Sequence, residues 1–413
     1  MIVSDLYIAL PVMNESERLP MLINSIMEQT VNEFRLVVCV NQPDSWWYDS
    51  LHRGICEENQ YTIQYLKSLN DKRIEIIDKS SPGSGWLPGA QGIGYARKLI
   101  LDYISSVARE NDCIISMDAD TVFSNEYFSS IIQNIRNNPE AYAISVPYYH
   151  KLSGNSELDR AMLRYEIYMR AYAVNMWRIS SPYCFTALGS AIAFPVWAYR
   201  KVGGMTPKLS GEDFYFLQKI VKTGRLIHWN SEIVYPATRL SDRVFFGTGP
   251  ALIKGIDGDW SSYPVYSYRL FDKIAATYKL FGELYKGNME TPLDDFLINR
   301  FGELPWDKLR KNYKTSSHFM RACHEKIDGL RILQFLKDSQ PPDEHISEAS
   351  LTDILSLYKD QFQGQFSGLK PDIRFEETPI DDLDLIRDFL FTIEQNYRKT
   401  HWDGIKHIKI LPD

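Results

Sequence analysis

Short apolar segments that alternate with helical patterns constrain the fold of this chain most strongly. Up to about residue 250, segments rich in Val and Ile are separated by stretches with apolar residues at helical spacing. Strands that read as continuous apolar runs between helices are typical of a mostly parallel sheet covered on both faces. The pattern therefore predicts an α/β fold in which helices flank the sheet. The predicted strands are residues 6–10, 35–40, 73–77, 113–117 and 141–146.

The pattern changes after about residue 260, where strand signals stop and helical signals dominate. At about 150 residues per domain, the 413 residues are enough for two or three domains. We predict an α/β domain over residues 1–258 and a mainly α-helical C-terminal domain over residues 259–413. The predicted C-terminal helices are residues 268–285, 293–301, 316–337, 346–362 and 380–397.

The charge balance and the cysteines limit the partners and the compartment. Lys and Arg total 46 against 53 Asp and Glu, which gives a formal net charge of −7. Because proteins that bind nucleic acid usually have a basic excess or a basic face, we expect no nucleic-acid partner. The five Cys residues form no C-x-x-C pair, which favours a reducing compartment.

No segment reads as a signal peptide or as a membrane-spanning helix. Asp5 interrupts the N-terminus before a long apolar stretch forms, and no run of about 18 apolar residues occurs. We therefore expect a cytoplasmic protein, and we leave open a peripheral contact with the inner face of the membrane. The oligomeric state is not visible in the sequence.

Polar residues directly follow four of the predicted strands. Ligands of open α/β sheets bind beyond the carboxyl ends of the strands, so we expect these residues to line one crevice. They are Pro11 to Glu15, Asn41 to Asp44, Asp78, and Asp118 with Asp120.

The segment from Ile114 to Asp120 carries the strongest local signal. An apolar strand runs straight into Asp118 and Asp120, which can face the same side at the two-residue period of a strand. Two carboxylates suit Mg²⁺ or Mn²⁺, which bind through few carboxylates plus substrate phosphates. The alternative is a polar strand end in which one Asp caps the helix that begins near Ser124. A D-x-D pair alone is a weak motif.

A second acidic pair, Glu212 and Asp213, precedes a helical pattern. Ser210 and Asp213 resemble a capping box, and acidic residues in a first turn interact favourably with the helix dipole. In the other interpretation, Asp213 is a general base at the rim of the crevice. A helix N-terminus tends to lower the pKa of a carboxyl group, which weakens the base unless burial opposes the effect. The two interpretations are compatible.

The glycine-rich stretch from Gly83 to Gly94 does not match the common nucleotide motifs. It contains G-x-x-G-x-G rather than G-x-G-x-x-G, and the sequence has no P-loop. These absences count against dehydrogenases and NTPases. A glycine loop that enters a helix carrying Arg97 can still approach a phosphate closely.

Over roughly residues 5–250 the chain resembles the family-2 glycosyltransferases of the GT-A fold, because four features occur in the order shown by that family. The resemblance implies the transfer of a sugar from a nucleoside-diphosphate donor, usually metal-assisted and with inversion. The four features are a strand ending in Pro11-x-x-Asn14-Glu15, a glycine loop leading to Arg97, a strand ending in Asp118-Ala119-Asp120, and Gly189 to Phe194 followed by Gly211-Glu212-Asp213.

The resemblance also implies roles for individual residues. Asp213 would be the base that deprotonates the acceptor hydroxyl, with Glu212 beside it. Asp118 would contact the ribose or the metal, and Asp120 would bind the metal, Mn²⁺ or Mg²⁺. The donor could be of UDP or GDP type, because Asn41 stands where many members have an Asp that reads the base. The donor-binding residues would be Pro11, Asn14, Glu15, Asn41, Arg97, Asp118 and Arg243.

Other residues are weaker candidates. Arg243, favoured over Arg239, precedes a Gly-rich segment that looks like a loop closing over a diphosphate. The second D-x-D, residues 257–259, follows no strand and is interpreted as a turn without metal. His228 lies in an apolar run and is more typical of a core residue than of a third metal ligand. The aromatic residues of the helix 159–178 are more typical of a core than of an acceptor wall.

We therefore predict a metal-dependent glycosyltransferase that acts on a saccharide or lipid-linked envelope-precursor hydroxyl. Two alternatives remain open on the sequence: a nucleotidyltransferase on a related sheet, and a non-catalytic scaffold that binds nucleotide sugars. A nucleotidyltransferase usually has a Gly-rich loop with a basic residue after its first strand, where this chain has Met13, Asn14 and Glu15.

Overall fold

The chain forms two compact units, each built from separate stretches of sequence. Unit 1 comprises residues 1–153 and 186–253, and unit 2 comprises residues 154–185 and 254–413. The division into domains after residue 258 stays a prediction. The computed structural model describes residues 5–241, 247–362, 368 and 373–405.

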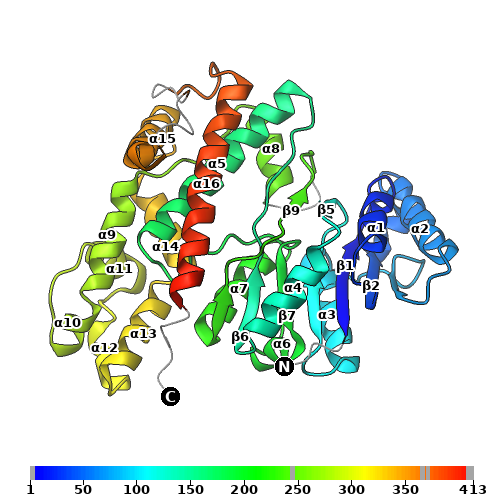
Figure 1. Ribbon diagram of the computed structural model, residues 1–413, viewed down its shortest axis with the longest axis horizontal. Coiled ribbons are helices and arrows are strands. Elements are labelled where there is room, and N and C mark those ends of the chain that lie inside the picture. Colours follow the sequence, from blue (N-terminus) through cyan, green and yellow to red (C-terminus); the bar gives the residue numbers. More distant parts are fainter. Residues whose placement is uncertain (1–4, 242–246, 363–367, 369–372, 406–413) are drawn as a thin grey trace. The chain divides into compact units, whose positions relative to one another are not determined.

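A seven-stranded sheet forms the centre of unit 1 (Figure 1). Its strands are β1 (Leu6–Val12), β2 (Phe34–Asn41), β3 (Ile74–Lys79), β4 (Cys113–Ser116), β6 (Ala141–Ser145), β7 (Ile192–Pro195) and β8 (Arg225–Ile227). Their order across the sheet is β3-β2-β1-β4-β7-β6-β8. The first four are parallel to one another, β8 is parallel to β6, and β7 is antiparallel to both of its neighbours. The predicted α/β fold with a mostly parallel sheet is confirmed.

Each of the five predicted strands is present in this sheet. β1 is buried along its whole length, as expected for a central strand covered on both faces. The prediction missed β7 and β8, which have four and three residues and are too short to show a periodic pattern. It also missed a separate antiparallel pair, β5 (Thr121–Phe123) and β9 (Val234–Pro236).

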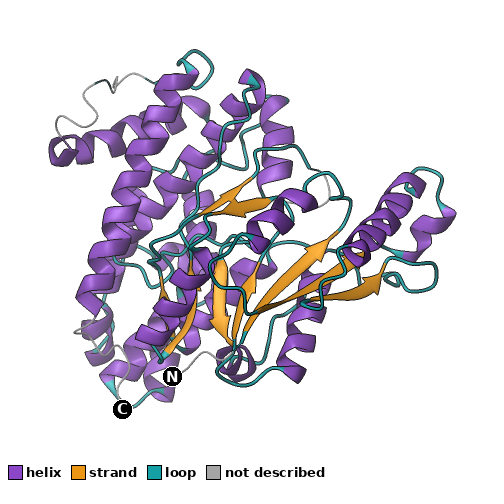
Figure 2. Cartoon of the chain, turned by 45° about the vertical axis from the view of Figure 1, so that its right-hand side comes forward, coloured by secondary structure: helices purple, strands orange, loops and turns teal. Residues whose placement is uncertain are grey.

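Helices of unit 1 connect and cover these strands, which are drawn in orange in Figure 2. One of them, α3, begins at the glycine loop, where Gly92 has a φ of 97°. A Cβ atom at Gly94 would lie 2.1 Å from the carbonyl oxygen of Lys208, so the close approach of the two segments requires glycine. The helices are α1 (Leu19–Met27), α2 (Arg53–Ser68), α3 (Ile93–Val107), α4 (Tyr127–Asn137), α6 (Val196–Lys201), α7 (Glu212–Thr223) and α8 (Thr248–Ile256), which ends in unit 2, with the 3-10 helix η1 (Asp44–Tyr48).

The secondary-structure elements of the described part of unit 2 are all helices, which confirms the predicted helical C-terminal region. The predicted helix 316–337 is two helices, because the side chain of Asp328 accepts the Arg331 N–H at 3.1 Å and caps a new helix. The helices are α5 (Ser156–Arg178), α9 (Tyr268–Lys279), α10 (Phe281–Lys286), α11 (Asp294–Phe301), α12 (Trp306–Asn312), α13 (Ser316–Lys326), α14 (Gly329–Ser339), α15 (Glu344–Tyr358), η2 (Lys359–Phe362) and α16 (Ile380–Ile405).

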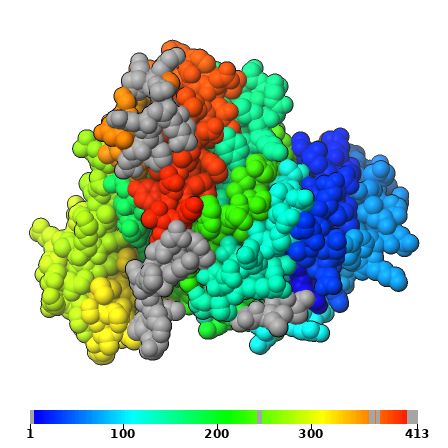
Figure 3. Space-filling view, in the orientation of Figure 1, coloured from blue at the N-terminus to red at the C-terminus, as the bar shows by residue number. Residues whose placement is uncertain are grey.

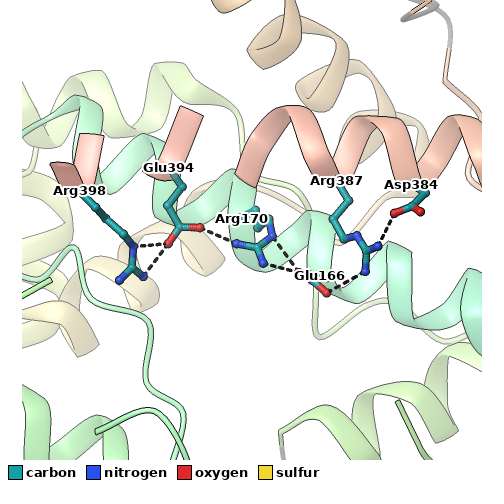
Figure 4. Close-up of polar contacts among 6 residues, drawn as sticks. All are labelled: Glu166, Arg170, Asp384, Arg387, Glu394 and Arg398. Atoms are coloured by element: carbon teal, nitrogen blue, oxygen red, sulfur yellow. Dashed lines mark hydrogen bonds and ion pairs between the residues drawn. The ribbon is translucent and has the colours of Figure 1, made fainter. Parts of the chain in front are cut away.

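A buried chain of ion pairs joins α5 to α16 (Figure 4). Arg170 Nε donates to Glu166 Oε1 at 2.9 Å, and Arg170 Nη1 donates to Glu394 Oε2 at 2.8 Å. Arg398 Nε donates to Glu394 Oε1 at 2.9 Å, and Arg387 Nη1 donates to Glu166 Oε2 at 3.4 Å. All five side chains are at most 2 % exposed. We call these five residues the ion-pair ladder.

The surfaces of α5 and α16 fit the predicted core role of the 159–178 segment. Met162, Tyr165 and Trp177 of α5 are buried. Part of α16 reaches the surface, where it is red in Figure 3, and Asn396 and Lys399 are exposed there. One face of α16 therefore packs against α5 and another faces solvent.

Two further predictions concern the whole chain. Among the described residues, no helix combines the length and the apolar character needed to cross a bilayer. All five cysteines are buried, and none of them forms a disulfide.

Candidate active site

Arg97, near the start of α3, lies at the centre of a cluster at the end of β4. It is 2 % exposed. Its Nη2 donates to Asp118 Oδ1 at 2.7 Å, and its Nε donates to Glu212 Oε1 at 3.1 Å. Its Nη1 donates to Ser116 Oγ at 2.5 Å and to the Gly189 carbonyl at 3.2 Å. One buried guanidinium therefore holds two of the predicted site carboxylates.

Charge pairing and packing both favour the buried position of Arg97. Burial alone disfavours the charge of Arg97, but Asp118 and Glu212 outweigh it and raise the pKa of the guanidinium. Gly189 provides the space: a Cβ atom there would lie 2.3 Å from Arg97 Nη2 and 3.2 Å from Asp118 Oδ2. The glycine of the predicted Gly189 to Phe194 motif thus has a packing role.

Asp213 is the second residue of α7. The N-cap residue of this helix is Gly211, which has a φ of 75°. The helix therefore starts one residue later than a capping box of Ser210 and Asp213 requires. Asp213 Oδ1 instead accepts the N–H of Phe214 at 2.7 Å.

The carboxyl group of Asp213 has an unusual affinity for protons. Burial and then the charge of Glu212 raise its pKa, while Arg97 and the Phe214 N–H lower it, and the result is a pKa of about 7. The group keeps part of its surface open, yet the protein around it removes most of its hydration. Asp213 is therefore buried enough to oppose the effect of the helix N-terminus, as its expected role as a general base requires.

Asp120, Glu15 and Arg239 form a second cluster, which we call the Arg239 cluster. Arg239 Nε donates to Asp120 Oδ2 at 2.7 Å, and its Nη2 donates to Glu15 Oε1 at 2.5 Å. Asp120 and Glu15 overcome the effect of burial and raise the pKa of Arg239. The favoured neighbour, Arg243, lies outside the described residues.

The ends of β1 and β2 are joined through Asn41. Its Nδ2 donates to the Val12 carbonyl at 2.9 Å, and its Oδ1 accepts the indole N–H of Trp86 at 3.1 Å. Asn14 has a φ of 56°, and its N–H donates to Asn59 Oδ1 at 2.9 Å. Pro11 lies one residue before the end of β1. Pro11, Asn14 and Asn41, three of the predicted donor-binding residues, are therefore all at or just beyond the ends of β1 and β2.

The competing interpretations of the acidic residues can be compared with the structure. The residue that caps α4 is Glu126, with no side-chain bond, so neither Asp118 nor Asp120 caps that helix. The second D-x-D is the predicted turn: Gly258 has a φ of 80°, and Asp259 accepts the N–H of Ser261 at 3.0 Å.

The two carboxylates at the end of β4 suit a metal ion whose remaining ligands come from the substrate. Within the described residues, no group of three or more His, Cys, Asp or Glu side chains could hold a metal, so His228 does not join the two aspartates in such a group. Asp118 and Asp120 remain 34 % and 17 % exposed. Mg²⁺ and Mn²⁺ commonly take one or two carboxylates plus substrate phosphates, and a guanidinium already sits on Asp120 as a stand-in cation. The two aspartates therefore fit such an ion.

The contacts of three residues in these clusters have no local signal in the sequence: Ser116, Gly189 and Arg239. The sequence hint for Arg239, its place with Arg243 before a Gly-rich segment, does not connect it with Asp120.

Residues 113–248 match the model of glycosyl transferase family group 2. The matched segment contains both aspartates of the D-x-D, the Glu212–Asp213 pair and Arg239. This match makes residues 113–248 similar to the glycosyltransferases of family group 2, and the sheet is of the mostly parallel type expected for that family. The predicted resemblance is confirmed.

Two solved structures show distant similarity to the chain. S. aureus TarS 1–349 in complex with UDP-GlcNAc is 13 % identical, with 96 % of this chain and 92 % of that chain covered and a TM-score of 0.39. The mannosyltransferase PcManGT from Pyrobaculum calidifontis with GDP-Man and Mn²⁺ is 12 % identical, with 96 % and 87 % covered and a TM-score of 0.39. No sequence among the curated proteins matches the chain. Because these TM-scores are low, the family assignment rests on the matched segment.

Proposed function

We propose that this chain moves a sugar from a nucleoside-diphosphate sugar to a hydroxyl of a saccharide or envelope-precursor acceptor, with inversion at the anomeric carbon. The observation that carries the proposal is the contact of the buried Arg97 with both Asp118 and Glu212, which brings the end of β4 and the start of α7 together. Burial and the charge of Glu212 raise the pKa of Asp213, beside Glu212, to about 7. A carboxylate whose pKa lies close to the working pH is suited to accept the proton of an acceptor hydroxyl.

In the proposed reaction, Asp213 takes the proton of the acceptor hydroxyl while the hydroxyl oxygen attacks the anomeric carbon. The bond between that carbon and the diphosphate oxygen breaks, and the nucleoside diphosphate leaves with the bonding electrons. A single displacement inverts the configuration of the carbon. A positioned general base typically contributes about 10²- to 10⁴-fold in rate. Arg97 holds Glu212, the neighbour of the base, and Asp118 in place.

We assign Asp118 and Asp120 as the residues that hold a divalent ion, Mn²⁺ or Mg²⁺. When bound, such an ion acts as a Lewis acid toward the leaving diphosphate. The support is the pair of partly exposed carboxylates at the end of β4, each of which pairs with a guanidinium. The assigned donor-binding residues are Pro11, Asn14, Glu15, Asn41, Arg97, Asp118 and Arg243.

Thermal unfolding with nucleotide and metal tests this proposal without knowledge of the acceptor. We expect UDP or GDP together with Mn²⁺ to raise the Tm of the full chain. Asp120→Asn should lose the metal-dependent part of the shift. Asp213→Asn should keep the shift but lose at least about 100-fold of the metal-dependent hydrolysis of the matching sugar nucleotide. Asp259→Asn, in the exposed turn of the second D-x-D, is the matched control and should behave like the parent chain.

Three outcomes would contradict the proposal. The first is the absence of any shift with either nucleotide and Mn²⁺. The second is an equal loss of nucleotide binding in the Asp120 and Asp213 variants, because the proposal gives the two residues different roles. The third is the release of pyrophosphate from a nucleoside triphosphate, which would indicate a nucleotidyltransferase.

A further inference from the structure

Arg239 bridges two carboxylates from distant parts of the sequence. It contacts Asp120, which follows β4, and Glu15, which follows β1. The side chains of Arg239 and Asp120 are 19 % and 17 % exposed, and that of Glu15 is buried. The guanidinium therefore lies at the edge of solvent, between two carboxylates that carry more negative charge than it neutralises.

The pairing of β5 with β9 brings Arg239 to this position. β5 begins directly after Asp120, and β9 ends three residues before Arg239. The two strands pair with Thr121 opposite Pro236, and the N–H of Ala237 donates to the Asp120 carbonyl at 3.1 Å. The backbones of residues 120 and 237 are thus joined, so the contact between the two side chains is a consequence of strand pairing.

The two site arginines differ in how firmly they are held. Arg97 is buried and donates to serine and carbonyl oxygens as well as to carboxylates, so it is a fixed part of the packing. Arg239 is partly exposed, and both of its acceptors are carboxylate oxygens. A cation that competes for those oxygens can displace Arg239 without unpacking the core.

We infer that Arg239 competes with the divalent cation for Asp120, and that metal binding releases its guanidinium toward the donor diphosphate. This inference rests on the proposed function, because it takes Asp120 as a metal ligand. Arg239 occupies Asp120 Oδ2 through both Nε and Nη2, so an ion that binds Asp120 through this oxygen displaces the Arg239 contact. A guanidinium presents a planar fork of donors that matches phosphate oxygens.

This exchange couples the two ligands. The metal binds weakly by itself, because it must replace a cation that is already in place. A diphosphate improves metal binding, since it offers the displaced guanidinium a new partner. By linkage, the metal improves diphosphate binding by the same factor. Arg239 thus favours the joint binding of metal and donor over the binding of either one.

Binding of Mn²⁺ to the nucleotide-free chain gives the first test, with free Mn²⁺ measured by its EPR signal. We expect Arg239→Gln to bind Mn²⁺ at least about fivefold more tightly than the parent chain, because the competing charge is gone. Arg225→Gln is the matched control, since Arg225 pairs with the exposed Glu140 of the same unit. Equal or weaker binding by Arg239→Gln would overturn the inference.

The coupling gives a second test. With saturating UDP or GDP, whichever shifts the Tm, the Mn²⁺ affinity of the parent chain should rise by about tenfold, within the usual range of coupling between ligands. In Arg239→Gln the same nucleotide should give a much smaller rise, and an undiminished rise would overturn the inference. If the parent chain binds no Mn²⁺ with or without nucleotide, the proposed function fails as well. If it binds Mn²⁺ and Arg239→Gln binds it no better, only the inference fails.

A third measurement needs no variant and so does not depend on its folding. Phenylglyoxal modifies accessible arginines, and mass spectrometry reports the rate at each position. In the parent chain, Mn²⁺ at the saturating concentration found above should accelerate the modification of Arg239 severalfold. Arg225, whose side chain is 24 % exposed, and the buried Arg97 should keep their rates. An unchanged rate at Arg239 would mean that the guanidinium is not displaced.

Discussion

At the scale of single residues, Asp213 experiences opposing effects on the pKa of its carboxyl group. Its place in the first turn of α7 and the Phe214 N–H both stabilise the ionised form. Burial and the neighbouring Glu212 stabilise the protonated form and outweigh them, so the pKa rises to about 7. The helix start positions the carboxyl group, and the surroundings tune it.

This pKa predicts the pH dependence of the reaction. A general base must be deprotonated, so kcat/KM for donor hydrolysis should rise with pH, reach half of its maximum near pH 7, and stay level above it. Glu212→Gln removes a charge that raises the pKa and should move the midpoint to lower pH. A pH-rate profile from pH 5 to 9 measures both effects. A flat profile, or one that falls with pH, would contradict the role of Asp213.

The raised pKa of Asp213 makes the free energy of unfolding fall as the pH rises, whereas it makes the rate rise. The folded pKa of Asp213 lies above the ordinary value of an Asp carboxyl, so the folded state holds the proton more tightly than the unfolded state. Its contribution to stability is therefore present below about pH 4 and is lost as the pH rises through about 7. Asp213→Asn should remove this trend from the pH dependence of unfolding, which serves as a control independent of catalysis.

Much of the candidate site was visible in the sequence, and the reasons for the misses are physical. Asp118, Asp120 and Asp213 follow apolar strands or start a helix, which is a local pattern. Arg97 and Arg239 make contacts across more than a hundred residues of sequence to Glu212 and Asp120. Local spacing carries no information on such pairs.

At the scale of elements, the ion-pair ladder specifies which helix pairs with α5. Two glutamates and three arginines alternate along the buried faces of α5 and α16, so each charge has an opposite neighbour (Figure 4). Buried pairs contribute little net stability against an apolar core, but the loss of one member leaves an unpaired charge in the interior. The ladder thus disfavours any register of the two helices that would separate the pairs.

The variant Glu394→Gln tests the ladder. It removes the carboxylate charge that Arg170 and Arg398 share in the interior, and we expect it to lower the free energy of unfolding by about 3 to 5 kcal/mol. Urea unfolding followed by circular dichroism gives the value. The control is Glu325→Gln in the exposed pair with Arg321, which should cost less than about 1 kcal/mol. A loss in Glu394→Gln no larger than in this control would mean that the ladder charges are hydrated.

Sequence patterns identified the longer elements and failed for the short ones. All five apolar segments became strands because each is long enough to show composition and boundaries. β7, β8, β5 and β9 have three or four residues each, and pairing with longer neighbours is what makes them strands.

At the scale of the whole molecule, the chain passes from unit 1 into unit 2 and back. α5 lies between β6 and β7 in the sequence, yet it belongs to unit 2 with helices more than two hundred residues away. A linear boundary after residue 258 therefore separates α5 from α16.

A chain that ends at residue 258 tests the consequence. It retains α5 but lacks α16, so Glu166 loses its contact with Arg387, Arg170 loses its contact with Glu394, and the apolar face of the helix is exposed. We expect this shorter chain to aggregate, or to be cleaved by protease within residues 156–178, under conditions in which the full chain is protected there. A monomeric short chain with α5 protected would show that the helix does not need unit 2.

The sequence by itself determined the class of the fold, the strand ends that carry Asp118 and Asp120, and the helix start that carries Asp213. These features depend on the periodicity of apolar residues and on turn residues, which act over a few positions. Only the tertiary structure decided that Arg239 sits on Asp120, that Arg97 is buried beneath Asp118 and Glu212, and that α5 pairs with α16. These contacts join segments far apart in sequence, and they depend on burial and charge pairing, which exist only after the chain has folded.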